Sequence, residues 1–140
     1  MLSGKKFLGI AIISALLIVI VFAYKEYHRQ PVNVARVKAD VTVNASNLMQ
    51  AFEENENAAN ERFLGKVIEV NGTVHSVINQ GDTLINIYLD ATATGKISCL
   101  IDDSYMKQGQ KVVPGIKHTI RGICTGYLLD VELNQCAIIQ

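Results

Sequence analysis

The chain of 140 residues contains three successive stretches whose hydrophobic residues recur with different periods. An uninterrupted apolar run extends from Phe7 to Ala23, apolar residues recur at helical spacing from Ala45 to Leu64, and apolar and polar residues alternate from Lys66 onward. The first pattern is typical of a membrane-spanning helix, the second of an amphipathic helix and the third of half-buried β-strands. We therefore expect a mainly β protein in which two helices precede the strands.

The apolar run, extended by one residue to Phe7–Tyr24, is the predicted transmembrane helix. At about 1.5 Å per residue it spans roughly 26 Å, which is just enough to cross a bilayer core. Lys5 and Lys6 precede it, and Tyr27 follows at the position of an interfacial aromatic residue. A cleaved signal peptide ending near Ala23 is the alternative, but the run is longer than an ordinary signal core. We expect a signal anchor and a single-pass protein of the inner (plasma) membrane, with its globular part on the periplasmic side.

A linker and one helix are predicted between this run and the strands. Pro31 ends any continuation of the first helix, because proline lacks a backbone N–H and clashes with the preceding turn. Residues 25–44 are predicted to be an extended linker, although their valines could instead form a short strand. A single helix is predicted from Ala45 to Leu64, with Ser46 as its N-cap and Gly65 as its stop. Its buried stripe consists of Leu48, Met49, Phe52, Ala59 and Phe63.

Five strands are predicted after this helix, namely Lys66–Ile78, Thr83–Asp90, Ile97–Ile101, Ile116–Cys124 and Asp130–Ile139. Gly72 indicates a bend in the first strand, and a bulge is expected near Asn134 and Gln135 in the fifth. Asp102–Gln108 is expected to form a short helical connection. A long bent first strand and a connector between the third and fourth strands are typical of a five-stranded OB-type barrel. The expected organisation is a basic N-terminus (1–6), a transmembrane helix (7–24), a linker (25–44) and a domain of helix plus barrel (45–140).

The charge is unevenly distributed, although the formal net charge is zero. Residues 1–38 contain six Lys or Arg and one Glu, whereas residues 39–140 contain seven basic and twelve acidic residues. Nucleic-acid binding usually needs a basic surface that displaces counterions from phosphates. The acidic globular part therefore disfavours a nucleic-acid ligand, although it leaves room for a locally basic patch.

The best candidate binding face combines cations and tyrosines from neighbouring strands. Lys96, Lys117 and Arg121 fall on outward positions of the predicted third and fourth strands. Tyr88 and Tyr127 could supply the aromatic platform on which OB-folds stack bases, but packing in the core or at the rim is the alternative for both. The sequence contains no nucleophile–base pair, phosphate-binding loop or metal-ligand spacing. We therefore expect no enzymatic activity, no cofactor and no metal.

The cysteines bear on the location of the barrel. Cys124 and Cys136 both point inward in the predicted fourth and fifth strands, which are expected to be neighbours, so a disulfide between them is a candidate. Cys99 would then remain as a buried thiol. Three free thiols are the alternative, and this state is the one expected of a cytoplasmic barrel.

Three motifs resemble a known family. They are Asn-Glu-x-Ala-Ala-Asn at 55–60, Gly-Lys-Val-x-x-Val-x-Gly at 65–72 and Gly-x-Cys-x-Gly-Tyr-Leu-x-Asp-Val at 122–131. Together with the intervening sequence, the segment from Tyr24 to Gln140 resembles the tRNA_anti-like OB-fold family, which is common in Bacteroidetes. The run Val113–Ile116 departs from the family pattern by lengthening the approach to the fourth strand. The resemblance implies a fold similar to tRNA anticodon-binding modules, and it does not by itself imply tRNA binding.

These features predict a membrane-anchored OB-fold binding module for a protein or envelope ligand outside the cytoplasm. The alternative is a module that binds single-stranded nucleic acid or tRNA through the barrel, which would require the barrel to be cytoplasmic.

Overall fold

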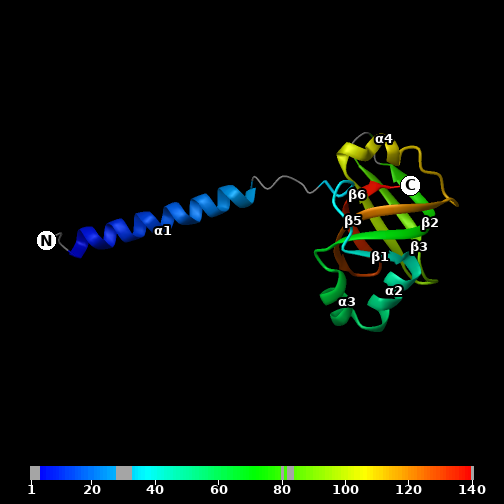
Figure 1. Cartoon of the computed structure of the whole chain (residues 1–140), viewed down its shortest axis with the longest axis horizontal. Helices are drawn as coiled ribbons and strands as arrows, with labels where there is room; N and C mark the ends of the chain where they lie inside the picture. Colours follow the sequence, from blue (N-terminus) through cyan, green and yellow to red (C-terminus); the bar gives the residue numbers. More distant parts are fainter. Residues whose placement is uncertain (1–3, 28–32, 80, 82–83, 140) are drawn as a thin grey trace. The chain divides into compact units, whose positions relative to one another are not determined.

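The computed structural model describes residues 4–27, 33–79, 81 and 84–139. The chain divides into two compact units, residues 1–31 and residues 32–140. The first unit contains helix α1, and the second contains the strands and the other helices (Figure 1).

Helix α1 (Gly4–Tyr27) coincides with the predicted apolar helix. From Ile12 to Phe22 its large apolar side chains have exposed fractions between 54% and 71%. Among the residues that the structure describes, however, no helix combines the length and the apolar character needed to cross a membrane. The helical conformation predicted for Phe7–Tyr24 is therefore confirmed, whereas its transmembrane character is not supported.

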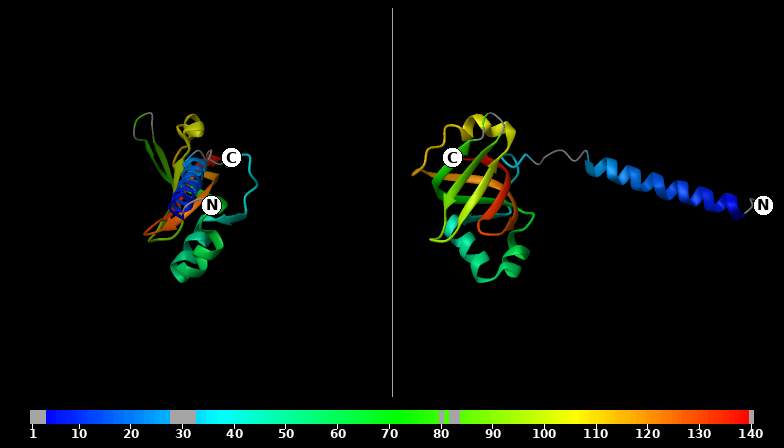
Figure 2. Two further views of the ribbon diagram at one scale, coloured as in Figure 1. Left: turned by 90° about the vertical axis from the view of Figure 1, so that its left-hand side faces the viewer. Right: turned by 180° about the vertical axis from the view of Figure 1, so that it is seen from behind.

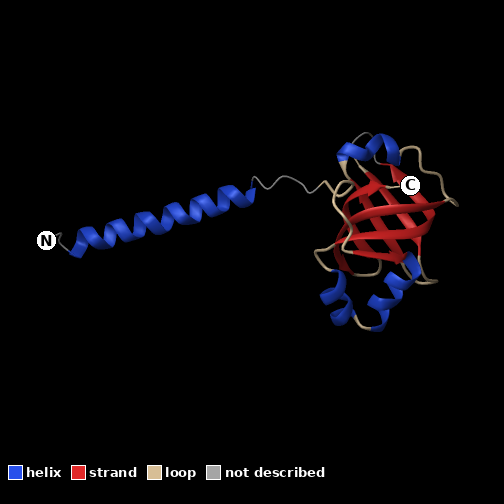
Figure 3. Cartoon of the chain, viewed as in Figure 1, coloured by secondary structure: helices blue, strands red, loops and turns tan. Residues whose placement is uncertain are grey.

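Five strands among the described residues form a closed barrel, namely β2 (Val67–Asn79), β3 (Ile85–Asp90), β4 (Lys96–Ile101), β5 (Lys117–Tyr127) and β6 (Val131–Ile138). They follow one another in the order β2–β3–β4–β6–β5, and β5 pairs back with β2. The β4–β6 pair is parallel and the other pairs are antiparallel. This arrangement, drawn in red in Figure 3, confirms the predicted mainly β, OB-type barrel.

The barrel interior is filled by alternate residues of each strand. In β3, Ile85, Ile87 and Leu89 are fully buried, whereas Asn86 and Tyr88 are partly exposed. Because successive side chains of a strand point to opposite faces, the apolar positions fill the core and the polar positions face outward. The outward positions are therefore where a ligand of the barrel wall would bind.

Strand β2 changes its partner strand just after Gly72, where a bend was predicted. Its first part, Val67–Thr73, pairs with β5, and its second part, from Val74, pairs with β3, with a register shift between Val74 and Ser76. A Cβ atom at position 72 would lie 3.0 Å from the Cβ of Ala45 and 3.1 Å from the Cβ of Leu89. Glycine at this position therefore lets β2 pass close to Ala45, the first residue of the preceding helix α2 (Ala45–Glu54).

The predicted single helix Ala45–Leu64 is divided into α2 (Ala45–Glu54) and α3 (Glu56–Phe63). Asn55 causes the break, because its backbone is extended and its side chain accepts a hydrogen bond from the Ala58 N–H at 3.1 Å. The N-cap of α2 is Asn44 and not the predicted Ser46. The predicted stripe is buried as expected and comprises Leu48, Met49, Phe52, Ala59 and Phe63.

Helical segments cover both ends of the barrel. The helices α2 and α3 lie at one end, and η1 (Asp103–Tyr105) with α4 (Met106–Gly109) lies at the other (Figure 2). The second pair matches the predicted helical connection between the third and fourth strands. Both ends of the core are thereby shielded from solvent, so the outer wall is the accessible surface of the barrel.

The predicted linker is partly integrated into the barrel unit. Val34 is buried to 1% exposure in a cluster with Val67 and Ala137. The carboxylate of Asp40 accepts a hydrogen bond from the Val67 N–H at 2.9 Å. Strand β1 (Val41–Asn44) then pairs in parallel with the start of β2. The alternative of a short strand within residues 25–44 is therefore confirmed.

The last two strands differ from prediction in their limits. Strand β5 begins at Lys117, leaves Ile116 outside with 53% exposure, and continues through Gly126 to Tyr127 instead of ending at Cys124. Strand β6 contains the expected bulge, where Gln135 has a positive φ of 53°. Register shifts against both neighbouring strands accompany this bulge.

Candidate functional site

Arg121 is the most strongly bound cation of the predicted binding face. Its Nη2 donates to Glu69 Oε2 at 2.6 Å and its Nε donates to the same oxygen at 3.1 Å. Its Nη1 donates to the backbone carbonyls of Val34, Ala35 and Val37. The two charged side chains are only 16% and 20% exposed. Arg121 therefore fastens the segment before β1 to the barrel and has little capacity left for a ligand. We call this set of contacts the Arg121 clamp.

The two tyrosines of the predicted face have different environments. The ring of Tyr127 packs against the core with its centroid 5.4 Å from that of Phe52. Tyr88 lies on the outer wall, where its hydroxyl accepts a hydrogen bond from Asn86 Nδ2 at 3.1 Å. The same amide nitrogen donates to Ser98 Oγ at 2.9 Å. Tyr127 is thus a packing residue, whereas Tyr88 belongs to an outward-facing polar group.

The two lysines lie apart from each other. Lys96 is on β4 in register with Asp90 of β3, so an acidic residue lies opposite it on the neighbouring strand. Lys117 begins β5, is exposed, and is in register with Thr73 of β2. The five predicted residues therefore do not form one basic face, and the structure places them at separate positions of the barrel wall.

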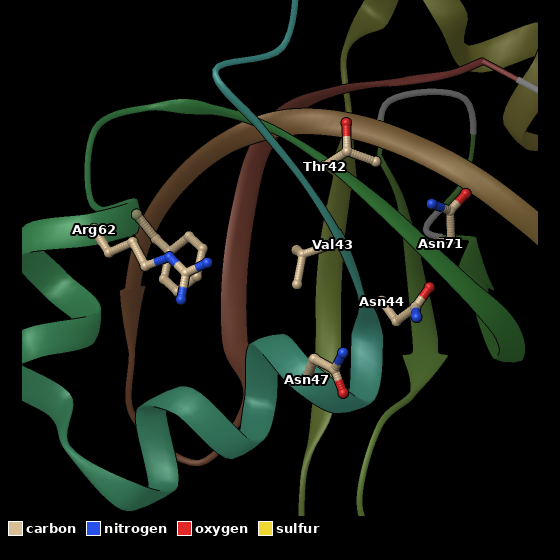
Figure 4. Close-up of a pocket in the computed structure, with 7 residues that line it drawn as sticks. Thr42, Val43, Asn44, Asn47, Arg62 and Asn71 are labelled. Atoms are coloured by element: carbon tan, nitrogen blue, oxygen red, sulfur yellow. The ribbon is translucent and has the colours of Figure 1, made fainter.

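A polar cavity of about 370 Å³ lies beside β1 (Figure 4). We call it the β1 groove and define it by its lining residues, which are Thr42, Val43, Asn44, Asn47, Arg62, Phe63 and Asn71. Strand β1 supplies three of these residues, and α2, α3 and β2 supply the others. The groove thus depends on the way in which both helices pack on the barrel.

Arg62 is the charged group of the β1 groove. It lies at the end of α3 with its guanidinium carbon 5.0 Å from the centroid of the Phe63 ring. Within the described part of the molecule it has no carboxylate at ion-pair distance. No Asp or Glu is among the residues that line the groove. Arg62 therefore offers an uncompensated positive charge with several N–H donors at the edge of a polar cavity.

Asparagine amides supply most of the remaining polarity. Asn71 accepts a hydrogen bond at its Oδ1 from the Thr119 hydroxyl, which leaves its amide N–H groups for the groove. The side chain of Asn44 precedes α2 without making a capping hydrogen bond. Amide groups both donate and accept hydrogen bonds, so the groove can bind neutral polar groups as well as an anion.

A second cavity of about 250 Å³ adjoins the first and shares Asn44 and Asn71 with it. Lys117 and Asp90 are at this second cavity. The carboxylate of Asp90 is 2.8 Å from Nδ1 of His75, with which it forms a hydrogen bond. Of the five residues predicted from the sequence, Lys117 is therefore the one that lies next to the β1 groove.

The tRNA_anti-like family matches the chain over residues 1–138. The chain belongs to this family. The resemblance noted in the sequence is thereby confirmed, whereas the match does not show that the protein is anchored in a membrane. No curated protein sequence matches the chain.

Solved structures are similar to this tRNA_anti-like protein to different extents. A Klebsiella pneumoniae protein described as a "putative nucleic acid-binding lipoprotein" superposes with a TM-score of 0.61 at 15% identity, covering 79% of this chain and all of that one. Asparaginyl-tRNA synthetase of Entamoeba histolytica gives a TM-score of 0.43 at 16% identity. That match covers 54% of this chain and 21% of the synthetase.

The three cysteines of this family member are buried free thiols, so the predicted Cys124–Cys136 disulfide is not present in the structure. The register places Cys124 opposite Leu133, and Cys136 opposite Ile101. Burial raises the pKa of the Cys124 thiol. Burial, reinforced by the neighbouring Cys99 side chain, raises the pKa of Cys136 well above its ordinary value. The thiols of Cys124 and Cys136 are therefore neutral core groups and poor nucleophiles near neutral pH.

Sequence reasoning on this tRNA_anti-like protein missed Arg62 and Asn47. Both lie outside the buried stripe of the predicted helix Ala45–Leu64, and their partners in the groove come from other elements. One local signal was available, because Asn44 and Asn47 are three residues apart and such residues share a side of a helix. Among the described residues, no group of three or more His, Cys, Asp or Glu side chains could hold a metal ion.

Proposed function

We propose that this tRNA_anti-like protein is a non-enzymatic binding module that is attached to a membrane through α1 and binds a protein ligand in the β1 groove, outside the cytoplasm. One observation carries the choice of site. Arg121 is held by Glu69 and three backbone carbonyls, whereas the amides of the β1 groove and Arg62 face an open cavity. Of these two sites, the groove is therefore the one that keeps hydrogen-bonding groups for a ligand.

The chemistry of the groove favours a polypeptide over a polyphosphate. Amide and hydroxyl side chains can pair with peptide N–H and C=O groups, and a single arginine suits one carboxylate. A nucleic-acid backbone needs several cations along its path, because affinity depends on counterion release. Here Lys117 is the neighbouring cation, and Asp90 lies in the same cavity.

Membrane attachment is supported by the apolar surface of α1. From Ile12 to Phe22 its large side chains are more than half exposed. A helix with apolar residues on all sides is normally covered by protein or by lipid. We propose lipid as the covering phase, with alkaline carbonate extraction of native membranes as the test. Release of the full-length protein into the supernatant would refute this part of the proposal.

Photo-crosslinking in living cells tests the ligand-binding part. The photoreactive residue p-benzoylphenylalanine is placed at position 47 in the groove and, as a control, at Lys107 on α4, at the other end of the barrel. We expect a discrete protein adduct from position 47 and none of the same mass from position 107. Identical adduct patterns, or no adduct from the groove, would contradict the proposal.

Single-stranded nucleic acid is the second candidate ligand. Tyr88 is an outward aromatic residue on β3, and OB-folds stack bases on such residues. The Klebsiella pneumoniae protein of similar fold carries a nucleic acid-binding description. The two candidates require opposite topologies, so fusions at the C-terminus distinguish them. An active alkaline phosphatase fusion supports the protein ligand, and a fluorescent GFP fusion with inactive phosphatase supports the nucleic acid.

A further inference from the structure

Strand β1 is an edge strand. Its one strand neighbour among the described residues is β2, so its other edge presents backbone N–H and C=O groups without strand partners. Proteins usually protect such an edge with lysine, proline, a bulge or a covering element. The four residues Val41–Asn44 include neither lysine nor proline. The edge is therefore chemically competent to pair with another extended polypeptide.

The β1 groove runs along this edge. Thr42, Val43 and Asn44 are consecutive and all line the groove, although successive side chains of a strand point to opposite faces. The groove is therefore not confined to one face of β1, and it also reaches Arg62 and Phe63 of α3 and Asn71 of β2. Figure 4 shows Val43 in the middle of the view, with Arg62 on one side of the strand and Asn47 below it.

The groove also has a fixed charge at its side. Arg62 belongs to α3, stacks on Phe63 and has no acidic partner among the described residues. The volume of about 370 Å³ is at the small end of the range for ligand pockets, which suits a short peptide segment. Charge complementarity therefore selects a ligand with a carboxylate close to the strand edge.

We propose that the ligand of the groove is an extended polypeptide segment that pairs with the free edge of β1 and carries one carboxylate that binds Arg62. This inference rests on the proposed function and specifies its partner. Backbone pairing to β1 supplies affinity that depends little on sequence. The carboxylate, from Asp, Glu or the terminal carboxyl group of the ligand, accepts the charge-assisted hydrogen bonds of the guanidinium and fixes the register. The amides of Asn44 and Asn47 bind polar groups of the segment that face away from the barrel.

Selection from a peptide library tests this inference. A phage-displayed library of random dodecapeptides is selected on the full-length protein in detergent micelles, and recovered peptides are measured by fluorescence anisotropy. We expect alternating β-formers with one acidic residue. Arg62→Gln should weaken their binding by about tenfold or more, as should replacement of the acidic residue by its amide. The matched control Lys107→Gln, on α4, should leave the affinity unchanged.

A backbone scan distinguishes strand pairing from other modes. Each position of the best peptide is N-methylated in turn, which removes one backbone donor. Pairing with an edge strand predicts that alternate positions lose binding, because only every second N–H points to the partner. The inference would be overturned if N-methylation had the same effect on affinity at every position, or if its effect recurred every three to four residues. It would also be overturned if Arg62→Gln bound the peptides as tightly as the unmodified protein, or if the selection recovered no peptide.

The outcome is separable from that of the proposed function. If position 47 gives a protein adduct but the N-methylation scan shows no alternation, the proposed function stands and pairing with β1 is rejected. Binding of a mixed-sequence oligonucleotide that is lost in Arg62→Gln would reassign the groove to nucleic acid and reject both.

Discussion

Replacement of Arg121 by methionine should destabilise the barrel unit and loosen the segment before β1. The substitution keeps most of the side-chain length but removes the guanidinium. Glu69 then loses its partner at 20% exposure, and the carbonyls of Val34, Ala35 and Val37 lose their donor. The Arg121 clamp would be lost, and the segment before β1 would no longer be fastened to the barrel.

The expected loss of stability follows from how deeply the Arg121–Glu69 pair is buried. Breaking a fully buried ion pair costs about 3–5 kcal/mol, and an exposed pair contributes about 0–1 kcal/mol. Exposures of 16% and 20% place this pair nearer the buried limit. With the backbone contacts included, we expect the free energy of unfolding to fall by about 3 kcal/mol, or the Tm by roughly 10 °C or more.

Urea unfolding of the full-length protein in micelles, followed by far-UV circular dichroism, measures this loss. The double variant Arg121→Met/Glu69→Gln should lose little more than Arg121→Met alone, since Glu69 no longer carries an unpaired charge. Trypsin should cleave faster after Arg36 and Lys38, which lie in the released segment. A loss below about 1 kcal/mol, typical of an exposed pair, would refute the clamp reasoning.

Four further predictions address other features. Gly72→Ala should lower the free energy of unfolding by about 1–3 kcal/mol, because the added methyl group overpacks the contact with Ala45. Ala45→Gly should restore part of this stability in a double-mutant cycle, and additive losses would contradict the proposed contact between positions 45 and 72. Ile18→Lys should move the full-length protein from membranes to the carbonate supernatant; an unchanged distribution would argue against attachment through α1. Burial raises the pKa of Cys136, so the thiol ionises at a lower pH in the unfolded protein than in the folded protein. The free energy of unfolding should therefore fall as the pH rises above 9.0, and it should fall less steeply in Cys136→Ala. A mixed-sequence single-stranded oligonucleotide should bind with a Kd above about 1 μM at physiological salt, as judged by anisotropy.

The barrel was predictable from sequence because its signal is local. In β3, alternation of Ile85, Ile87 and Leu89 with polar residues specifies which side faces the core. The same reasoning missed the break at Asn55, because the apolar stripe continues across it from Phe52 to Ala59. Local periodicity reports which side is buried and does not report whether the helix axis is continuous.

The site was much less predictable, because its residues are assembled from distant parts of the sequence. Arg121 looked like a free outward cation, and its partners in Val34–Val37 lie more than 80 positions away in sequence. Arg62 looked like an ordinary helix-surface charge, and only the packing of α3 beside β1 brings it to a cavity. Sequence pattern identifies which residues face outward, but it cannot tell which outward charges are already neutralised.

The β2–β5 pairing also determines the order in which the barrel can fold. Val67 starts β2 and pairs with Ile123, so the wall cannot close until synthesis has passed Ile123. The early strands β2, β3 and β4 and the helices α2 and α3 would wait with their apolar sides uncovered. Pairings between distant segments carry a large loop-closure entropy and slow folding. Closure by β5 and β6 should therefore be the late step, and a nascent polypeptide that stops before β5 would depend on chaperones to avoid aggregation.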